Sequence, residues 1–151
     1  MCGIAGEIRF DGTAVDLSVI ERMNARQAPR GPDDAGCFAA GPRGFGHRRL
    51  MVMDLSAHSQ QPMGDTEVVL KAYAEWGTDC LQHFQGMFAC AIWERDSGRT
   101  FLARDRLGIK PLYYSLDATR LRFASTLPAL LDAGGIDTSI DTIALNHYLN
   151  F

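Results

Sequence analysis

The chain has 151 residues, of which 46% are hydrophobic and 22% are charged, and its formal net charge is −3. This length suits one ordinary domain, and the composition is that of a soluble globular protein. The mild acidity argues against nucleic acid or anionic membrane as a partner, because both attract a concentrated basic face. No apolar run approaches membrane-spanning length and no secretory signal opens the chain, so we expect a cytoplasmic protein.

The first half of the chain alternates between strand and helix patterns. Alternating apolar residues predict a strand over 4–10, which the turn signal Asp11-Gly12 ends. Helical spacing predicts a helix over 16–27, with Ser18 and Glu21 as a capping box. We then expect a loop over 28–36, two or three short strands over 37–55 and a second loop over 56–63.

The second half follows the same two periodicities. A helix is predicted over 66–76, ending at Gly77, and a short helix over 79–85. The next predicted elements are a strand over 87–94, a strand over 100–105, a hairpin over 112–125, and helices over 127–134 and 142–150. Since the strand over 87–94 is apolar on both faces, it should be covered on both sides. The pattern as a whole predicts an α+β domain with helices on the faces of its sheets.

Four cysteines, at positions 2, 37, 80 and 90, are widely spaced without a C-x-x-C pair, so neither a zinc site nor a disulfide framework is predicted. The last three lie in apolar surroundings and should be small core residues. The histidines share no metal-binding spacing, and we expect structural or surface roles for His47, His58, His83 and His147.

Cys2 has an unusual position directly after the initiator methionine. Methionine aminopeptidases remove Met1 when the next residue is small, and Cys2 would then carry both a thiol and a free α-amine. That amine, with a pKa of about 8, can take the thiol proton and activate the nucleophile. The alternative is that Cys2 is an inert residue that begins a buried strand.

Seven motifs occur in the order seen in glutamine-dependent asparagine synthetases: MCGIAG, RGPDDAG, GHRRLMVMDLS, QQPM, DTEVVLKAYAEWG, GMFACAIWERDSG and ARDRLGIKPLYY. The chain thus resembles their N-terminal glutaminase domain, a class II glutamine amidotransferase of the N-terminal-nucleophile (Ntn) hydrolase fold. This resemblance covers residues 1–151 and implies a four-layer sandwich of two mostly antiparallel sheets flanked by helices. The ending RFASTLPALLDAGGIDTSID is more similar to the N-acetylglutaminylglutamine amidotransferases, which amidate a dipeptide.

The resemblance also implies roles at the positions that match. Cys2 would be the nucleophile and its freed amine the base, Arg49 would bind the α-carboxylate of glutamine, Val52 would offer backbone hydrogen bonds, and Asp65 would accept the α-ammonium. A guanidinium fork is well shaped for a carboxylate. Without the resemblance, the residues alone also allow Arg49 to be a solvated strand residue and Asp65 to be the N-cap of the following helix.

One family motif is missing. The family carries an Asn-Gly segment that supplies the oxyanion hole, but here Met63 is followed directly by Gly64. This apparent internal gap is either a real deletion or a place where residues of the protein are left out of the sequence. Losing one oxyanion donor costs roughly a hundredfold to a thousandfold in rate. If residues are unlisted, the Cα atoms of Met63 and Gly64 should lie farther apart than the roughly 3.8 Å of a trans peptide.

Two hypotheses for function remain open. In the first, the domain hydrolyses L-glutamine and passes ammonia to an ATP-dependent synthetase domain of the same full-length protein, absent from this chain. No cofactor is then expected in this domain, because ATP and magnesium would belong to the synthetase domain, and a homodimer is left open. In the second, the domain is catalytically silent and serves as a structural or dimerisation module.

Overall fold

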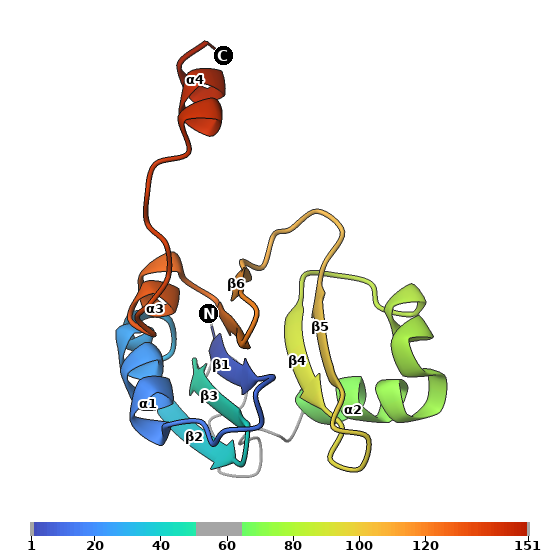
Figure 1. Ribbon diagram of the computed structural model, residues 1–151. Coiled ribbons are helices and arrows are strands. Elements are labelled where there is room, and N and C mark those ends of the chain that lie inside the picture. The colour runs from blue at the N-terminus through green and yellow to red at the C-terminus, as the bar shows by residue number, and fades with distance from the viewer. Residues whose placement is uncertain (1, 51–64, 151) are drawn as a thin grey trace.

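The computed structural model describes residues 2–50 and 65–150, and the fold within these ranges is α+β (Figure 1). Five of the described strands form an antiparallel sheet in the order β2-β3-β1-β7-β6. Their bounds are β1 Gly3–Arg9, β2 Asp34–Ala40, β3 Arg43–Arg49, β6 Tyr113–Leu116 and β7 Arg120–Ala124. The central strand is β1, which pairs with β3 on one side and with β7 on the other.

A second antiparallel sheet consists of β4 (Ala89–Trp93) and β5 (Thr100–Arg104). Figure 1 shows helices on the outer side of each sheet. The larger sheet is covered by α1 and α3, and the smaller by α2 and the 3-10 helix η3; their bounds are α1 Leu17–Arg26, α3 Leu127–Leu131, α2 Asp65–Trp76 and η3 Gly77–Gln82. The expected sandwich of two antiparallel sheets flanked by helices is confirmed.

The outer face of the larger sheet forms the core with α1. Ile20 and Met23, three residues apart on this helix, are both fully buried and pack against Ala5 and Ala124 of the sheet. The helix approaches closely because β3 carries glycine: a Cβ atom at Gly44 would lie 2.7 Å from Cγ1 of Ile20. The glycine is therefore required by packing at this position.

The N-terminus of α1 is capped by Asp16, and the predicted capping box of Ser18 with Glu21 is wrong. Oδ1 of Asp16 accepts the backbone N–H of Ser18 at 2.9 Å. Because the helix begins at Leu17, Ser18 is already within its first turn, and the position that closes a capping box falls on Val19. Likewise, the predicted loop over 28–36 contains a short 3-10 helix, η1 (Ala28–Arg30), and the first residues of β2.

Aromatic rings and one arginine connect the layers. Phe38 of β2 contacts Trp93 of β4 with ring centroids 6.1 Å apart. Arg43 of β3 lies over the same indole, 5.4 Å from the ring centre, and donates to the carbonyl oxygen of Gly98 at 2.5 Å. These contacts link the larger sheet to the β4–β5 hairpin. A tilted aromatic pair therefore joins two strands while a cation covers the indole.

The helix α2 packs on the outer face of the smaller sheet. Tyr73 stacks on Phe101 of β5 with ring centroids 5.1 Å apart, and its hydroxyl donates to Glu94 at 2.6 Å. The inner face of this sheet contacts the larger one through Trp93, and Ile92 of β4 is buried. The other four residues of β4 are half-buried, so the strand predicted to be covered on both sides is covered only in part.

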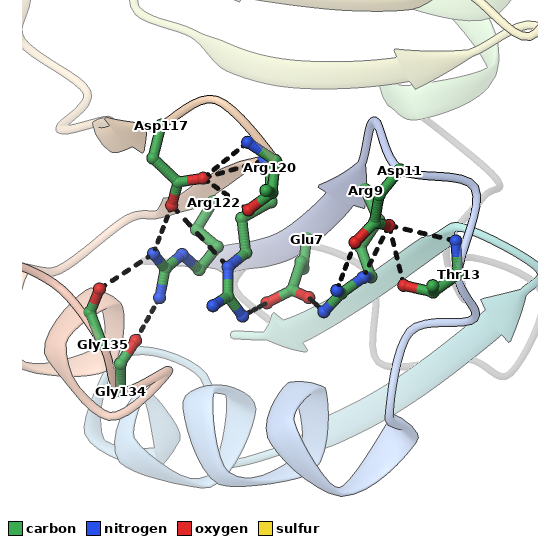
Figure 2. Close-up of polar contacts among 10 residues, drawn as sticks. Glu7, Arg9, Asp11, Thr13, Asp117, Arg120, Arg122, Gly134 and Gly135 are labelled. Atoms are coloured by element: carbon green, nitrogen blue, oxygen red, sulfur yellow. Dashed lines mark hydrogen bonds and ion pairs between the residues drawn. The ribbon is translucent and has the colours of Figure 1, made fainter.

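A charged network lies at the end of β1 that is remote from Cys2 (Figure 2). Figure 2 shows the buried carboxylate of Glu7 between Arg9 and Arg120, with nitrogen–oxygen distances of 3.6 and 4.0 Å. Arg9 also pairs with Asp11 at 2.7 Å, in the turn that follows β1. Each buried charge of this part of the network thus has an opposite charge beside it.

The same network holds the chain where it leaves α3. Arg122 of β7 is 0% exposed and donates to a carboxylate oxygen of Asp117 at 3.1 Å. Its guanidinium also donates to the carbonyl oxygens of Gly134 and Gly135 (Figure 2). A buried guanidinium therefore fixes the segment that leads to the last helix.

The last described helix, α4 (Thr142–Asn150), lies away from both sheets at the end of an extended segment (Figure 1). Its apolar side chains are exposed, including Ile143, Tyr148 and Leu149. In the part of the chain that the structure describes, no helix is both long enough and apolar enough to span a bilayer.

Candidate active site

Cys2 lies just before β1, beside the end of β3. The backbone N–H of Leu50 donates to Sγ of Cys2 at 3.5 Å, and this sulfur lies 4.0 Å from the carbonyl oxygen of Leu50. Nε of Arg30 donates to the carbonyl oxygen of Cys2 at 3.3 Å. Because Cys2 is also exposed, its thiol is held by the sheet and open to a ligand.

The thiol opens on a cavity of about 400 Å³, which lies within the range of about 300–1,000 Å³ typical of small-molecule sites. Its lining includes the cationic residues Arg30 and Lys110 and the apolar residues Met87, Phe88 and Pro111, together with Ser125. Two cations beside an apolar wall suit a small anionic or zwitterionic ligand.

Ser125 connects this cavity to the strand pairing. It is 4% exposed, its Oγ accepts the N–H of Ile4 at 3.0 Å, and its own N–H donates to the carbonyl oxygen of Ile4 at 2.8 Å. The end of β7 is therefore tied to β1 two residues from Cys2.

A larger cavity, of about 580 Å³, lies between the two sheets. Its walls are mainly apolar, with Phe45, Phe123 and Trp93 among the lining residues, and Cys2 is not one of them. Because Cys2 is the expected nucleophile and lines the smaller cavity, we assign the candidate site to that cavity.

The predicted site residues are described to different extents. Arg49 ends β3 and is 7% exposed, and because Gly3 pairs with Arg48, the register continued by one residue sets Arg49 opposite Cys2. Arg49 is thus a buried residue, and the alternative of a solvated strand residue is wrong. Val52 and the Met63–Gly64 junction lie outside the described residues. Asp65 is the first residue of α2, and its side chain lies outside the described part as well.

Two cations at the cavity, Arg30 and Lys110, were missed by the sequence reasoning. Both belong to motifs that carry the family resemblance, RGPDDAG and ARDRLGIKPLYY. Neither shows a spacing that points to Cys2, because Arg30 reaches the cavity from η1 and Lys110 from the loop between β5 and β6. The only available signal was therefore the specificity of the motifs themselves.

The other three cysteines differ from Cys2 in burial or in their place in the fold. Cys80 is fully buried, as predicted, whereas Cys90 is only partly buried and lines the cavity on which Cys2 opens; burial raises the pKa of Cys90 to about 11. Cys37 is exposed, so the prediction of a core residue is wrong there, because β2 is an edge strand. Within the described ranges, no three His, Cys, Asp or Glu side chains are grouped so that they could hold a metal ion.

A two-sheet sandwich with a cysteine at its N-terminus, open to a small cavity, fits a class II amidotransferase. The sequence model described as a glutamine amidotransferase domain matches residues 1–64 and 64–151, and the chain belongs to this family.

The similar proteins include asparagine synthetases. The chain is 31% identical to asparagine synthetase [glutamine-hydrolyzing] 3 of Bacillus subtilis over 184 aligned residues, covering 97% of this chain and 30% of that protein. It is 35% identical to the putative asparagine synthetase [glutamine-hydrolyzing] 2 of Methanocaldococcus jannaschii, covering 87% of this chain and 35% of that protein. The chain therefore spans about a third of the length of these relatives.

Proposed function

We propose that this domain hydrolyses L-glutamine to glutamate and ammonia, with the Cys2 thiol as nucleophile. The observation that carries the proposal is an exposed Cys2 at the start of the central strand, open to a cavity of about 400 Å³, in a chain of the amidotransferase family. The α-amine of Cys2, freed when Met1 is removed, serves as the base.

The chemistry balances with these groups alone. The amine takes the thiol proton, and the thiolate attacks the side-chain carbonyl carbon of glutamine. The carbon–nitrogen bond then breaks, the proton passes to the departing nitrogen, and ammonia leaves a thioester on Cys2. Water hydrolyses the thioester to glutamate and restores the thiol.

Substrate binding uses the charges near Cys2. Arg49 binds the α-carboxylate of glutamine, Asp65 binds the α-ammonium, and Val52 adds backbone hydrogen bonds, as the family resemblance implies. The burial of Arg49 and the register that continues toward Cys2 support its part of this assignment. A buried guanidinium binds a carboxylate strongly, because little water competes for it.

We infer that the chain lacks the family's oxyanion segment. The family match falls into two stretches that meet at Gly64. The Bacillus alignment covers 184 residues although the chain has only 151, so at least 33 aligned positions have no residue of this chain. Both findings support a missing segment. Because this segment supplies the oxyanion hole in the family, its loss favours the second candidate function, a catalytically silent module.

The ammonia is passed to an ATP-dependent synthetase domain of the longer protein. The names of the relatives, asparagine synthetases, and the third of their length that this chain covers support this assignment. The acceptor is aspartate or, if the ending of the chain reflects its branch, a dipeptide. A cytoplasmic location is part of the same proposal.

Ammonia release from glutamine tests the proposal. The mature chain should release ammonia, and Cys2→Ala should abolish the release. Cys37→Ala is the matched control, because this thiol is also exposed but belongs to the edge strand β2. A well-folded chain without activity would overturn the proposal and leave the silent module. Equal activity in the Cys2→Ala variant would also overturn it, because the nucleophile would then lie elsewhere.

A further inference from the structure

The loop between β5 and β6 is organised by one carboxylate. Asp105 directly follows β5 and is 6% exposed. Its Oδ1 accepts the backbone N–H of Ile109 at 2.8 Å, and its Oδ2 accepts that of Lys110 at 2.9 Å. These hydrogen bonds lower the pKa of Asp105, chiefly the one from Lys110. The carboxylate is therefore the acceptor for two successive backbone donors of the loop.

Arg104, the residue before it, holds the carbonyl groups of the same loop. Its Nε donates to the carbonyl oxygen of Lys110 at 2.7 Å, and its guanidinium also donates to the carbonyl oxygen of Gly108. The N–H and the C=O of Lys110 are thus bound by two neighbouring side chains of opposite charge. The loop is fixed at this residue rather than left to solvent, as connecting segments commonly are.

The fixed residue lies at the candidate active site. Lys110 and Pro111 line the cavity on which Cys2 opens, and so does Phe88, whose carbonyl oxygen accepts the N–H of Asp105 at 2.8 Å. Asp105 is not among the described lining residues. It reaches the cavity only through the backbone that it holds.

We propose that Asp105 is a positioning residue for glutamine, which fixes the wall formed by Lys110 and Pro111 opposite the Cys2 thiol. The proposal rests on the proposed function, because that function supplies the substrate. The proposal gives the motif ARDRLGIKPLYY a role: its acidic residue, Asp105, shapes the substrate cavity through the backbone that it holds, without lining the cavity itself. Only a carboxylate serves both donors, because an asparagine would turn an –NH₂ group toward one of the two backbone N–H groups.

Steady-state kinetics of Asp105→Asn test the proposal. We expect KM for glutamine to rise by about two- to tenfold, the range that corresponds to the typical net contribution of one hydrogen bond, with a smaller change in kcat. Asp117→Asn is the matched control, because Asp117 also accepts two backbone N–H groups, those of Thr119 and Arg120, but in the remote β6–β7 turn. An unchanged KM in Asp105→Asn, or an equal rise in both variants, would overturn the proposal.

Alkylation of the thiol provides a readout that does not depend on turnover. In the wild-type chain, Lys110 at the cavity should favour anionic iodoacetate over neutral iodoacetamide at Cys2. Displacing the wall in Asp105→Asn should lower this preference, with the exposed Cys37 as internal reference and Asp117→Asn unchanged. A preference that does not change in Asp105→Asn would sink the proposal even if the chain hydrolyses glutamine. If instead the preference falls but the wild-type chain hydrolyses no glutamine, the proposed function fails and the role of Asp105 at the cavity stands.

A second variant, Arg104→Met, keeps the proposal testable if Asp105→Asn misfolds. The Arg104 side chain is exposed, so its replacement leaves the core intact, but it removes both bonds to the loop carbonyls. This variant should raise KM and lower the iodoacetate preference in the same direction as Asp105→Asn. Wild-type values for both quantities would show that the loop does not need to be held.

Discussion

Glu7 on β1 and Arg122 on β7 stand directly opposite each other in the strand register, and both are buried on the face of the sheet that α1 and α3 cover. Two opposite charges thus occupy positions that an ordinary sheet would fill with apolar side chains. Each has further partners, Arg9 and Arg120 for Glu7 and Asp117 for Arg122. The network is therefore sensitive to the loss of one member, because the remaining charges stay buried.

Replacing Arg122 should strongly destabilise the domain. Arg122→Met removes the donor to Asp117, Gly134 and Gly135, and we expect a loss of about 3–5 kcal/mol in the free energy of unfolding. Urea unfolding followed by circular dichroism measures it. The exposed Arg95→Met is the control and should lie within about 0.5 kcal/mol of the wild type. A loss below about 1 kcal/mol in Arg122→Met would contradict the role of the network.

The stability should depend on pH through Asp117. The hydroxyl and N–H of Thr119 lower the pKa of its carboxyl to about 2, from an ordinary value of about 3.9. Its contribution is therefore complete above about pH 4 and is lost as the pH falls toward 2. The difference in the free energy of unfolding between the wild type and Asp117→Asn should shrink over this window. A difference that stays constant from pH 5 to 2 would contradict the prediction.

Processing of the N-terminus should control activity. While Met1 remains, the amine of Cys2 is part of a peptide bond and cannot take the thiol proton. A chain with a retained N-terminal extension should therefore lose nearly all glutaminase turnover, measured as ammonia release after intact-mass analysis of the N-terminus. Equal turnover in extended and processed chains would mean that the base lies elsewhere.

Glutamine affinity should depend on Asp65. Asp65→Asn removes the negative charge proposed to face the α-ammonium, and binding should weaken by about 1.5–3 kcal/mol, the value of a charge-assisted hydrogen bond. Isothermal titration with the Cys2→Ala chain measures it without turnover. The alkylation rate of Cys2 by iodoacetamide in Asp65→Asn serves as the control and should not change. An unchanged affinity would leave Asp65 with a role only at the start of α2.

The close packing at Gly6 should not tolerate a side chain. A Cβ atom there would lie 2.4 Å from Cζ of Phe123 and 2.8 Å from the carbonyl oxygen of Gly44. Gly6→Ala should cost about 1–3 kcal/mol of stability, as overpacked cores do. The second change Phe123→Leu frees part of this space, so the double variant should lose less than the sum of the two single losses. Strict additivity in thermal or urea unfolding would contradict the contact.

The elements of the fold could be predicted from the sequence because local signals are strong. The alternation around Leu121 and Phe123 predicts β7, and the glycine after Trp76 predicts the end of α2, where Gly77 has a positive φ of 57°. What alternation did not reveal is that Arg122, on the polar side of this strand, is fully buried. Its burial depends on carbonyl groups of Gly134 and Gly135, which only the tertiary fold brings near.

The site was predictable only in part, for a similar reason. Cys2 is marked by its position in the chain, and Arg49 by the family resemblance. Lys110 reaches the cavity because Asp105 bends the chain back on itself, and no local pattern reports where such a loop ends. The N-cap of α1 was predicted two residues too late, at Ser18 instead of Asp16. Both residue types are good caps, and only the backbone conformation decides between them.

The place of Cys2 beside the central strand links its chemistry to the cohesion of the whole sheet. The first residues of a chain usually fray at little cost, but here Gly3 pairs with Arg48 and Ile4 exchanges hydrogen bonds with Ser125 on the other side. The backbone next to the thiol therefore opens only when the neighbouring strands separate. As a result, protection of these amides from hydrogen exchange and survival of the reactive geometry should be lost together, in one cooperative event on heating.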